Sequence, residues 1–128
     1  MSRLTAVWMS VILAGASAPA LAHHSFPATY IVDQTVTIKG TVVQFLFRNP
    51  HSFVHVEAPD KDGKMITWAV EWGAGGALGS DNVTSETIKP GDKVIITGNP
   101  ARDLSSHRLR MHSILRPSDG FKWEGTFG

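Results

Sequence analysis

Short stretches of alternating residues, separated by turn-forming residues, dominate the sequence after its first quarter. Ser52 to Ala58 and Met65 to Trp72 alternate between apolar and polar side chains, which is the period of a half-buried β-strand. The segments that bound such stretches are rich in Asn, Pro, Asp and Gly, as at 60–63 and 89–92. The sequence shows no long amphipathic helical repeat. The pattern therefore predicts an all-β fold.

Five strands are expected, at 35–47, 52–58, 65–72, 93–98 and 109–115. The Gly-rich segment between the third and fourth strands is expected to be irregular or to hold a short helix. This order of elements is that of the OB-fold, a small five-stranded antiparallel Greek-key barrel. Gly40 lies in the middle of the long first strand, where a barrel strand has to bend. A simple antiparallel sandwich is the alternative.

The alternation also predicts how the second and third strands pair. Their apolar faces must meet in one core, so Val56 should lie opposite Trp68, and Val54 opposite Val70. That register leaves a short turn that ends at Gly63 in the left-handed conformation. The residues predicted to face inward are Val54, Val56, Ile66, Trp68, Val70, Val94 and Ile96.

The first 22 residues have the pattern of a secretory signal-peptide helix, with a basic start, an apolar stretch and the small-x-small end Ala20-Leu21-Ala22. The apolar stretch is shorter than the roughly 20 residues of a membrane anchor and is followed by Pro19, so export with cleavage is favoured over anchoring. We expect a periplasmic or secreted protein. The expected parts are a signal peptide (1–22), an N-terminal arm (23–34), a barrel domain (35–117) and a C-terminal tail (118–128).

Composition excludes several classes of function. The 128 residues contain no cysteine, which excludes disulfides, thiolate metal sites and a cysteine nucleophile. Cleavage after Ala22 would remove one of the 12 basic residues and none of the 11 acidic ones, so the exported chain would be neutral. Nucleic acid is therefore not an expected partner. No nucleophile elbow, phosphate-binding loop or zinc-protease motif is present, and we do not expect an enzyme.

Histidine is the residue type that suggests a binding site. All six histidines follow the expected cleavage site, and His23 would become the first residue of the exported chain. A terminal histidine offers an amine and an imidazole nitrogen, which together with a second imidazole form a T-shaped copper site. The other candidate ligands are His24, His51 and His107. The competing interpretation is that the histidines are ordinary surface, capping or terminal residues.

Two further expectations concern these histidines. Cleavage after Ala20 would instead make His23 the third residue, an arrangement that binds Cu(II) or Ni(II) through the amine, two backbone nitrogens and the imidazole. In an OB-fold the loops after the first and fourth strands flank the same face. The loops 49–51 and 99–107, which carry His51 and His107, are therefore expected at the same rim of the barrel.

A non-catalytic binding module is the second interpretation of the function. OB barrels bind oligosaccharides, peptides or oligonucleotides across their second and third strands. The candidate residues for such a face are Phe53, His55, Glu71 and Trp72. The expected partner is then a small ligand or another protein of the cell envelope. A structural envelope component without a small ligand is a third interpretation.

Several segments, taken in order, resemble a known group of proteins. They are Ala22-His23-His24-Ser25-Phe26, Lys39-Gly40-Thr41-Val42, Asn49-Pro50-His51, Trp68-Ala69-Val70-Glu71 and Lys89-Pro90-Gly91-Asp92. In this order they resemble a family of small exported bacterial proteins of unknown function. The resemblance implies export and a single domain, and it implies no mechanism.

Overall fold

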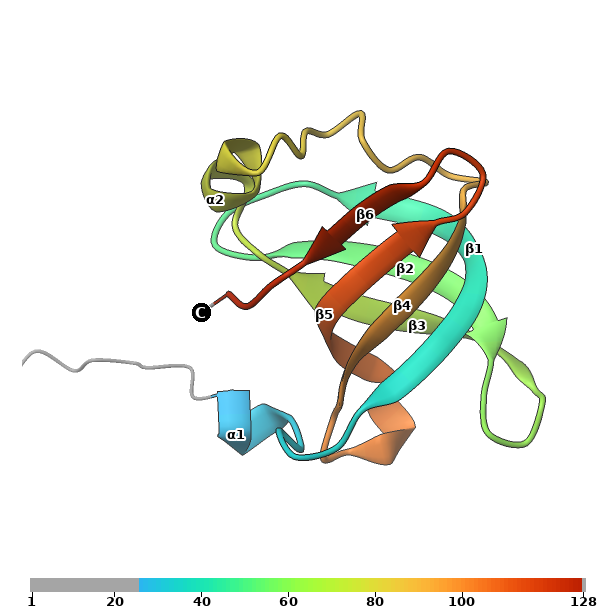
Figure 1. Ribbon diagram of the computed structural model, residues 1–128. Helices are drawn as coiled ribbons and strands as arrows, with labels where there is room; N and C mark the ends of the chain where they lie inside the picture. Colours follow the sequence, from blue (N-terminus) through green and yellow to red (C-terminus); the bar gives the residue numbers. More distant parts are fainter. Residues whose placement is uncertain (1–25, 128) are drawn as a thin grey trace, which may run out of the picture.

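The computed structural model describes residues 26–127, which form a β-barrel with short helices at its ends (Figure 1). The expected signal peptide and the candidate ligands His23 and His24 lie outside these residues. In chain order the elements are α1 (Phe26–Thr29), β1 (Val36–Leu46), β2 (Ser52–Pro59), β3 (Met65–Trp72), α2 (Gly75–Ser80), β4 (Lys93–Pro100), the 3-10 helix η1 (Leu104–Ser106), β5 (Arg108–Arg116) and β6 (Phe121–Glu124).

The five expected strands are present and close into a barrel. They are joined antiparallel in the order β3-β2-β1-β4-β5, and a parallel pairing between β3 and β5 closes the ring. In this β3–β5 seam Val70 lies opposite Leu109, and Glu71 lies opposite Arg110. The predicted OB-like barrel is therefore confirmed, and the sandwich is not formed. The short helix α2 lies between the third and fourth strands, as expected.

A sixth strand extends the sheet beyond the prediction. The segment 118–128, expected to be a C-terminal tail, contains β6, which pairs antiparallel with the second half of β5. Trp123 of β6 lies opposite Ile114 and is buried. A strand of 4 residues is too short for its alternation to be recognised from the sequence.

β1 changes its pairing partner next to Gly40, where the sequence predicts a bend. β1 pairs with β4 from Val36 to Thr41 and with β2 from Thr41 to Leu46, so it changes partners directly after Gly40. A Cβ atom added at Gly40 would lie 2.2 Å from the carbonyl oxygen of Glu57 on β2. The close approach of β2 is the reason that this position requires glycine.

The predicted register of β2 and β3 is confirmed. Val56 lies opposite Trp68, Val54 lies opposite Val70, and Gly63 has a φ of +81°. Among the residues predicted to face inward, those that are buried are Val54, Val56, Val70, Val94 and Ile96. Ile66 and Trp68 are only half-buried. The core therefore forms where the alternation placed it, with less cover over the first half of β3.

The prediction that Trp72 belongs to an exposed ligand face is wrong. Trp72 is fully buried, and its ring centroid lies 5.8 Å from that of Phe45 and 5.3 Å from that of Trp123. The physical reason is strand parity, because alternate residues of a strand point to the same side. Trp72 therefore points inward with Trp68 and Val70.

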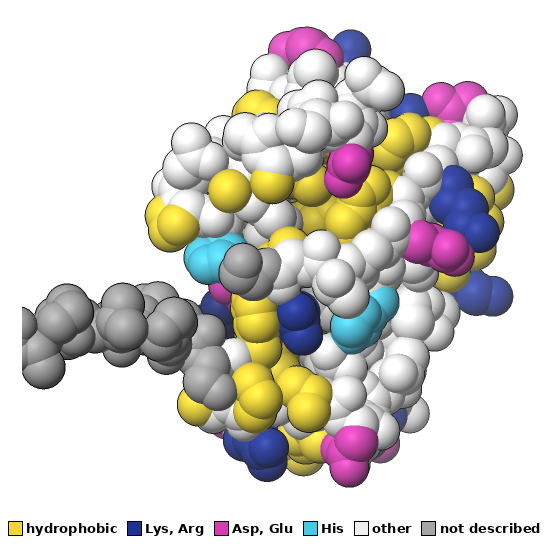
Figure 2. All heavy atoms as spheres, turned by 60° about the vertical axis from the view of Figure 1, so that its left-hand side comes forward, with side chains coloured by type: hydrophobic (Ala, Val, Ile, Leu, Met, Phe, Trp, Pro, Cys, Tyr) yellow, Lys and Arg dark blue, Asp and Glu magenta, His cyan; other side chains and the backbone are white. Residues whose placement is uncertain are grey.

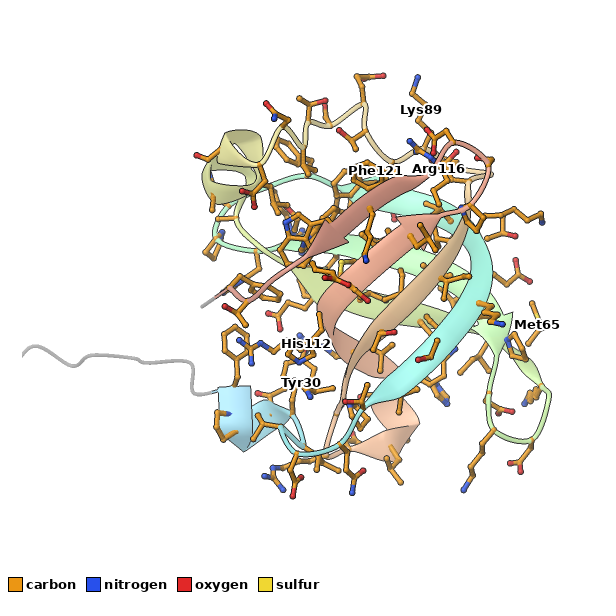
Figure 3. The ribbon with its side chains drawn as sticks, viewed as in Figure 1. Tyr30, Met65, Lys89, His112, Arg116 and Phe121 are labelled. Atoms are coloured by element: carbon orange, nitrogen blue, oxygen red, sulfur yellow. The ribbon has the colours of Figure 1, made fainter. Side chains whose placement is uncertain are left out.

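Different segments cover the two ends of the barrel. Leu78 of α2, with Val83 and Ile88 from the connection that follows, is buried at one end. α1 and η1 lie at the other end (Figure 1). Tyr30 follows α1 there, far from the β5–β6 hairpin that carries Arg116 (Figure 3). Within residues 26–127, no helix has the length and apolar character needed to cross a membrane.

Candidate functional site

A buried carboxylate lies on the outer side of the β3–β5 seam. Glu71 is only 8% exposed, although strand parity points it away from the barrel interior. The hydroxyl of Tyr30 donates a hydrogen bond of 2.7 Å to Oε2 of Glu71. Nη2 of Arg108 lies 3.9 Å from the same oxygen, and Nδ1 of His51 lies 4.0 Å from Oε1. Three segments that are distant in the sequence thus meet at one carboxylate.

The N-terminal arm is what covers Glu71. Tyr30 forms an isolated β-bridge with Ala101, directly after β4. The side chain of Arg102 donates a hydrogen bond of 2.7 Å to the carbonyl of Pro27. These contacts hold the arm against the end of β4. Glu71, predicted to lie on an open ligand face, is therefore covered, and the sequence pattern of its own strand contains no sign of the cover.

The loop between β1 and β2 holds His51 beside this carboxylate. The hydroxyl of Ser52 accepts a hydrogen bond of 3.1 Å from the backbone N–H of Arg48 and donates one of 3.2 Å to the Arg48 carbonyl. The side chain of Arg48 also donates to the carbonyl of His51 at 3.3 Å. The backbone on both sides of His51 is thereby fixed.

Aromatic rings from both ends of the described chain frame His51. The ring centroids of Phe26 and Phe127 lie 6.2 Å and 6.1 Å from that of His51, and 5.4 Å from one another. The guanidinium carbon of Arg110 lies 3.8 Å from the Phe26 ring centroid, and its Nη2 donates a hydrogen bond of 2.7 Å to the Phe127 carbonyl. Arg110 thus joins the N-terminal arm to the C-terminal segment over the seam.

Burial shifts the pKa values of Tyr30 and Arg110, which lie near Glu71. Burial, and then the hydrogen bond to Glu71, raise the pKa of Tyr30 well above its usual range, so Tyr30 stays a proton donor. Burial lowers the pKa of Arg110, and the attraction of Glu71 acts in the opposite direction. A neutral phenol and positively charged guanidinium groups therefore surround the carboxylate at neutral pH.

The two ring nitrogens of His51 have different surroundings. Nδ1 is buried and has no hydrogen-bond partner among the described residues. It faces Oε1 of Glu71 at 4.0 Å, about 1 Å longer than a hydrogen bond. The side chain as a whole is 26% exposed, so another part of the ring reaches the surface while Nδ1 does not.

The cavity at this site is small and has a mixed lining. Its volume is about 280 Å³, and it is lined by Phe26, Thr29, Tyr30, Pro50, His51, Glu71 and Arg108. Three of the segments that carry the family resemblance contribute to it, through Phe26, Pro50-His51 and Glu71. In the space-filling view, apolar side chains on this side of the molecule lie next to cationic and histidine side chains (Figure 2).

The described residues do not complete a metal site by themselves. Between residues 26 and 127, no three side chains of His, Cys, Asp or Glu are grouped so that they could hold a metal ion. His51 and Glu71 are close, but a third such side chain is not near them. A metal ion held by three side chains of these four types would therefore need at least one ligand from outside this range.

The other predicted site residues lie elsewhere. The ring of His107 packs edge-on against Trp68, with centroids 5.6 Å apart. Nδ1 of His55 lies 3.2 Å from the side-chain oxygen of Gln44. The ring of Phe53 is contacted by two guanidinium groups, those of Arg48 and Arg108, whose carbons each lie 5.4 Å from the ring centroid. With Trp72 inside and Glu71 covered, the four predicted ligand-face residues do not form one open face.

His51 and His107 line two different cavities, and Arg108 lines both. The structure thus separates two histidines that were expected to share a rim site. Tyr30, Arg110 and Phe127 were not predicted as site residues. The one sequence signal for Tyr30 is that the only tyrosine of the chain falls in a short arm expected to be outside the barrel.

Comparison with known proteins places the chain in a family without assigning an activity. No curated protein and no solved structure matches the sequence. The sequence profile described as "Family of unknown function (DUF6152)" matches residues 11–110, which is most of the chain. This agrees with the resemblance to proteins of unknown function. The chain therefore belongs to this family of unknown function.

Proposed function

We propose that the protein is exported to the periplasm or the cell exterior and binds copper beside Glu71. The observation that carries the proposal is the placement of His51 against this buried carboxylate. Histidines that bind metals usually turn their second ring nitrogen toward a carboxylate or carbonyl, which fixes the ring and its tautomer. Here Glu71 faces Nδ1, and in this proposal Nε2 binds the metal ion.

The N-terminal histidines supply the remaining ligands in this proposal. Cleavage after Ala22 makes His23 the first residue, with a free amine and an imidazole. His23 precedes Phe26 by three positions, and three residues of chain span at most about 11 Å. Because the Phe26 ring lies 6.2 Å from the His51 ring, His23 and His24 are within reach of Nε2.

The donor set accounts for the choice of metal. An amine and imidazole nitrogens suit copper, which binds such ligands more tightly than the other divalent metals of its row. Glu71 acts as a positioning residue, because its Oε2 is already engaged by Tyr30 and faced by Arg108. His107 has no part in the proposal, since it lies in the other cavity. The proposal assigns binding of a metal ion and no catalytic reaction.

Mass spectrometry of the exported protein, with and without added copper, tests the proposal directly. We expect a chain that begins at His23 and takes up a single copper ion. Adding one residue before His23, or replacing His51→Gln, should remove tight binding, whereas His24→Ala should have a smaller effect. His107→Gln is the matched control and should bind as the unaltered chain does. Unchanged affinity in both the extended chain and His51→Gln would overturn the proposal.

The copper affinity of a Glu71 variant tests the role of this residue separately. Loss of a carboxylate that orients a ligating histidine typically lowers metal affinity roughly tenfold to hundredfold. Glu71→Gln should therefore weaken copper binding while the stoichiometry stays the same. If Glu71→Gln bound copper as tightly as the unaltered protein, the carboxylate would not orient the ligand.

A further inference from the structure

A second and larger cavity lies at the end of the barrel that carries η1. Its volume is about 430 Å³, and its apolar wall includes Val36, Ile38, Pro59, Trp68, Pro100 and Leu104. Pockets for small molecules typically measure about 300–1,000 Å³ and have mostly apolar linings with a few polar groups. Apart from Arg108, no residue of this cavity lines the one beside Glu71.

Two apolar side chains of this cavity are left incompletely covered. Trp68 packs against the core but is only half-buried, and Leu104 of η1 is 69% exposed. The indole N–H of Trp68 is buried without a hydrogen-bond partner in the described part of the chain. A bound molecule with an apolar body would remove this surface from water, which is the main favourable contribution to binding in an apolar pocket.

The backbone of His107 directs its ring into the same place. His107 has a φ of +49°, a left-handed conformation that is uncommon for residues other than glycine. It ends η1, and its ring stands edge-on to Trp68 at 5.6 Å. The two rings form a corner that a flat ring can enter, because aromatic rings favour edge-on and offset contacts.

The acidic groups of the cavity are occupied within their own turns. Oδ1 of Asp60 accepts hydrogen bonds from the backbone N–H groups of Asp62 and Lys64, in the β2–β3 turn. Oδ1 of Asp103 accepts from both the hydroxyl and the backbone N–H of Ser105 at the start of η1, and these bonds lower its pKa. One oxygen of each carboxylate is therefore already engaged within its own turn.

The donors of the cavity are engaged less fully. Within residues 26–127, Lys61 forms no ion pair, whereas the guanidinium of Arg108 is engaged on the Glu71 side, 3.9 Å from Oε2 of Glu71 and with its carbon 5.4 Å from the Phe53 ring centroid. Lys61 and the imidazole of His107 therefore leave hydrogen-bond donors around an apolar corner. We propose that this cavity binds a small molecule with a flat apolar ring and one acidic group. The ring lies against Trp68 and His107, and the acid faces Lys61.

The test uses the exported protein without copper and the probe 2-naphthoate. Binding is followed by NMR through the indole N–H signals, with 2-naphthylmethanol and 2-naphthylmethylamine as the neutral and cationic counterparts. We expect the Trp68 signal to shift on titration and the signals of the buried Trp72 and Trp123 to stay in place. Naphthoate should bind more tightly than either counterpart. Equal or tighter binding of the amine, or no shift at Trp68, would overturn the proposal.

Three variants and one matched control locate the site. Leu104→Ser removes an exposed apolar side chain of the cavity, and Met65→Ser removes one at the margin of β3 that is 54% exposed and lies outside the cavity (Figure 3). The first should weaken naphthoate binding about threefold or more, and the control should leave it unchanged. Lys61→Glu should weaken naphthoate binding without weakening that of naphthylmethanol.

His107→Asn completes the set. Asparagine adopts the left-handed conformation readily, so this change removes the imidazole and keeps the end of η1. It should weaken binding of all three naphthalene probes, since the ring contact is lost. Equal effects of Leu104→Ser and Met65→Ser would show that the probe binds to exposed apolar residues in general and would refute a defined cavity. Because copper is absent, these outcomes do not depend on the copper proposal.

Discussion

Tyr30, in the N-terminal arm, donates a hydrogen bond of 2.7 Å to the buried carboxylate of Glu71 on β3. The contact joins two residues 41 positions apart. It helps to bury the side chain of Glu71 on the outer side of the β3–β5 seam. Without the arm, Glu71 would be an ordinary surface residue, and His51 would face water. The site therefore depends on the segment that follows the expected cleavage site directly.

Removing the Tyr30 hydroxyl should destabilise the protein measurably. A hydrogen bond to a charged group contributes about 1.5–3 kcal/mol, and a buried carboxylate that loses its donor retains its desolvation cost. We expect Tyr30→Phe to lower the free energy of unfolding by about that amount in urea denaturation. Thr37→Val is the control, because it removes only an exposed hydroxyl contact with Thr97. Equal losses in the two variants would show that Glu71 does not need the phenol.

Replacement by alanine should change the stability in opposite directions at two glycines, Gly40 and Gly79, because their surroundings differ. A Cβ at Gly40 would meet the carbonyl oxygen of Glu57 at 2.2 Å, so Gly40→Ala should cost about 1–3 kcal/mol or more. At Gly79, in α2, nothing among the described residues lies within 4 Å of an added Cβ, so Gly79→Ala should stabilise the protein by about 0.5–1 kcal/mol. Thermal unfolding of both variants checks the pair. A tolerated Gly40→Ala would contradict the close approach of β2 to β1.

Asp119, in the β5–β6 hairpin, should make the stability of the protein depend on pH in the acidic range. The hydrogen bond from Arg116, followed by one from the backbone of Phe121, lowers the pKa of Asp119 from 3.8 to about 2. A lowered carboxyl pKa means that the unfolded chain takes up a proton first as the pH falls. The stabilisation by Asp119 is therefore complete above about pH 3.8 and is lost as the pH falls through about 2.

Urea midpoints of the unaltered protein and Asp119→Asn measure this contribution. The difference between the two should be present at pH 7 and should vanish near pH 2. Asp33→Asn is the control, because Asp33 is exposed and forms no ion pair within residues 26–127. A difference for Asp119→Asn that did not change with pH would show that Arg116 does not hold the carboxylate.

His112 should make the stability of the protein depend on pH in a second range, at higher pH than Asp119. Burial, and then the positive charge of Arg110, lower the pKa of His112 below 6.5, and its Nε2 is hydrogen-bonded to Oδ1 of Asn99. As the pH falls through 6.5, His112 takes up a proton in the unfolded chain, whereas in the folded chain it stays neutral until a lower pH. The contribution of His112 to the free energy of unfolding should therefore be fully present above pH 6.5 and decrease below it.

The measurement compares unfolding midpoints at pH 7.5 and pH 5.5. His112→Gln should lower stability at pH 7.5, since the contact with Asn99 changes, but should reduce the loss between the two pH values. His55→Gln, on the outer side of β2, is the control and should keep the pH dependence of the unaltered chain. The interpretation fails if His112→Gln loses as much stability on acidification as the unaltered protein.

Local patterns in the sequence determined the strands and their pairing. Alternation at 52–58 and 65–72 sets which side chains share a face, so it also sets the register of β2 and β3. The turn residues set the boundaries, and Gly40 marks where β1 changes partners. The same parity places Trp72 inside, so its correct position was available from the sequence as well. These features are predictable because each depends on residues close together in the chain.

Only the tertiary structure decided what lies on the outer side of the strands. Alternation says that Glu71 points away from the core, but it does not say what covers that side. The cover consists of Tyr30 and Arg108, which reach Glu71 because the β3–β5 seam and the path of the arm bring distant segments together. Such contacts have no periodic signal in the sequence. They depend on side chains that meet only after the barrel has closed, and they turn an exposed glutamate into the centre of the candidate site.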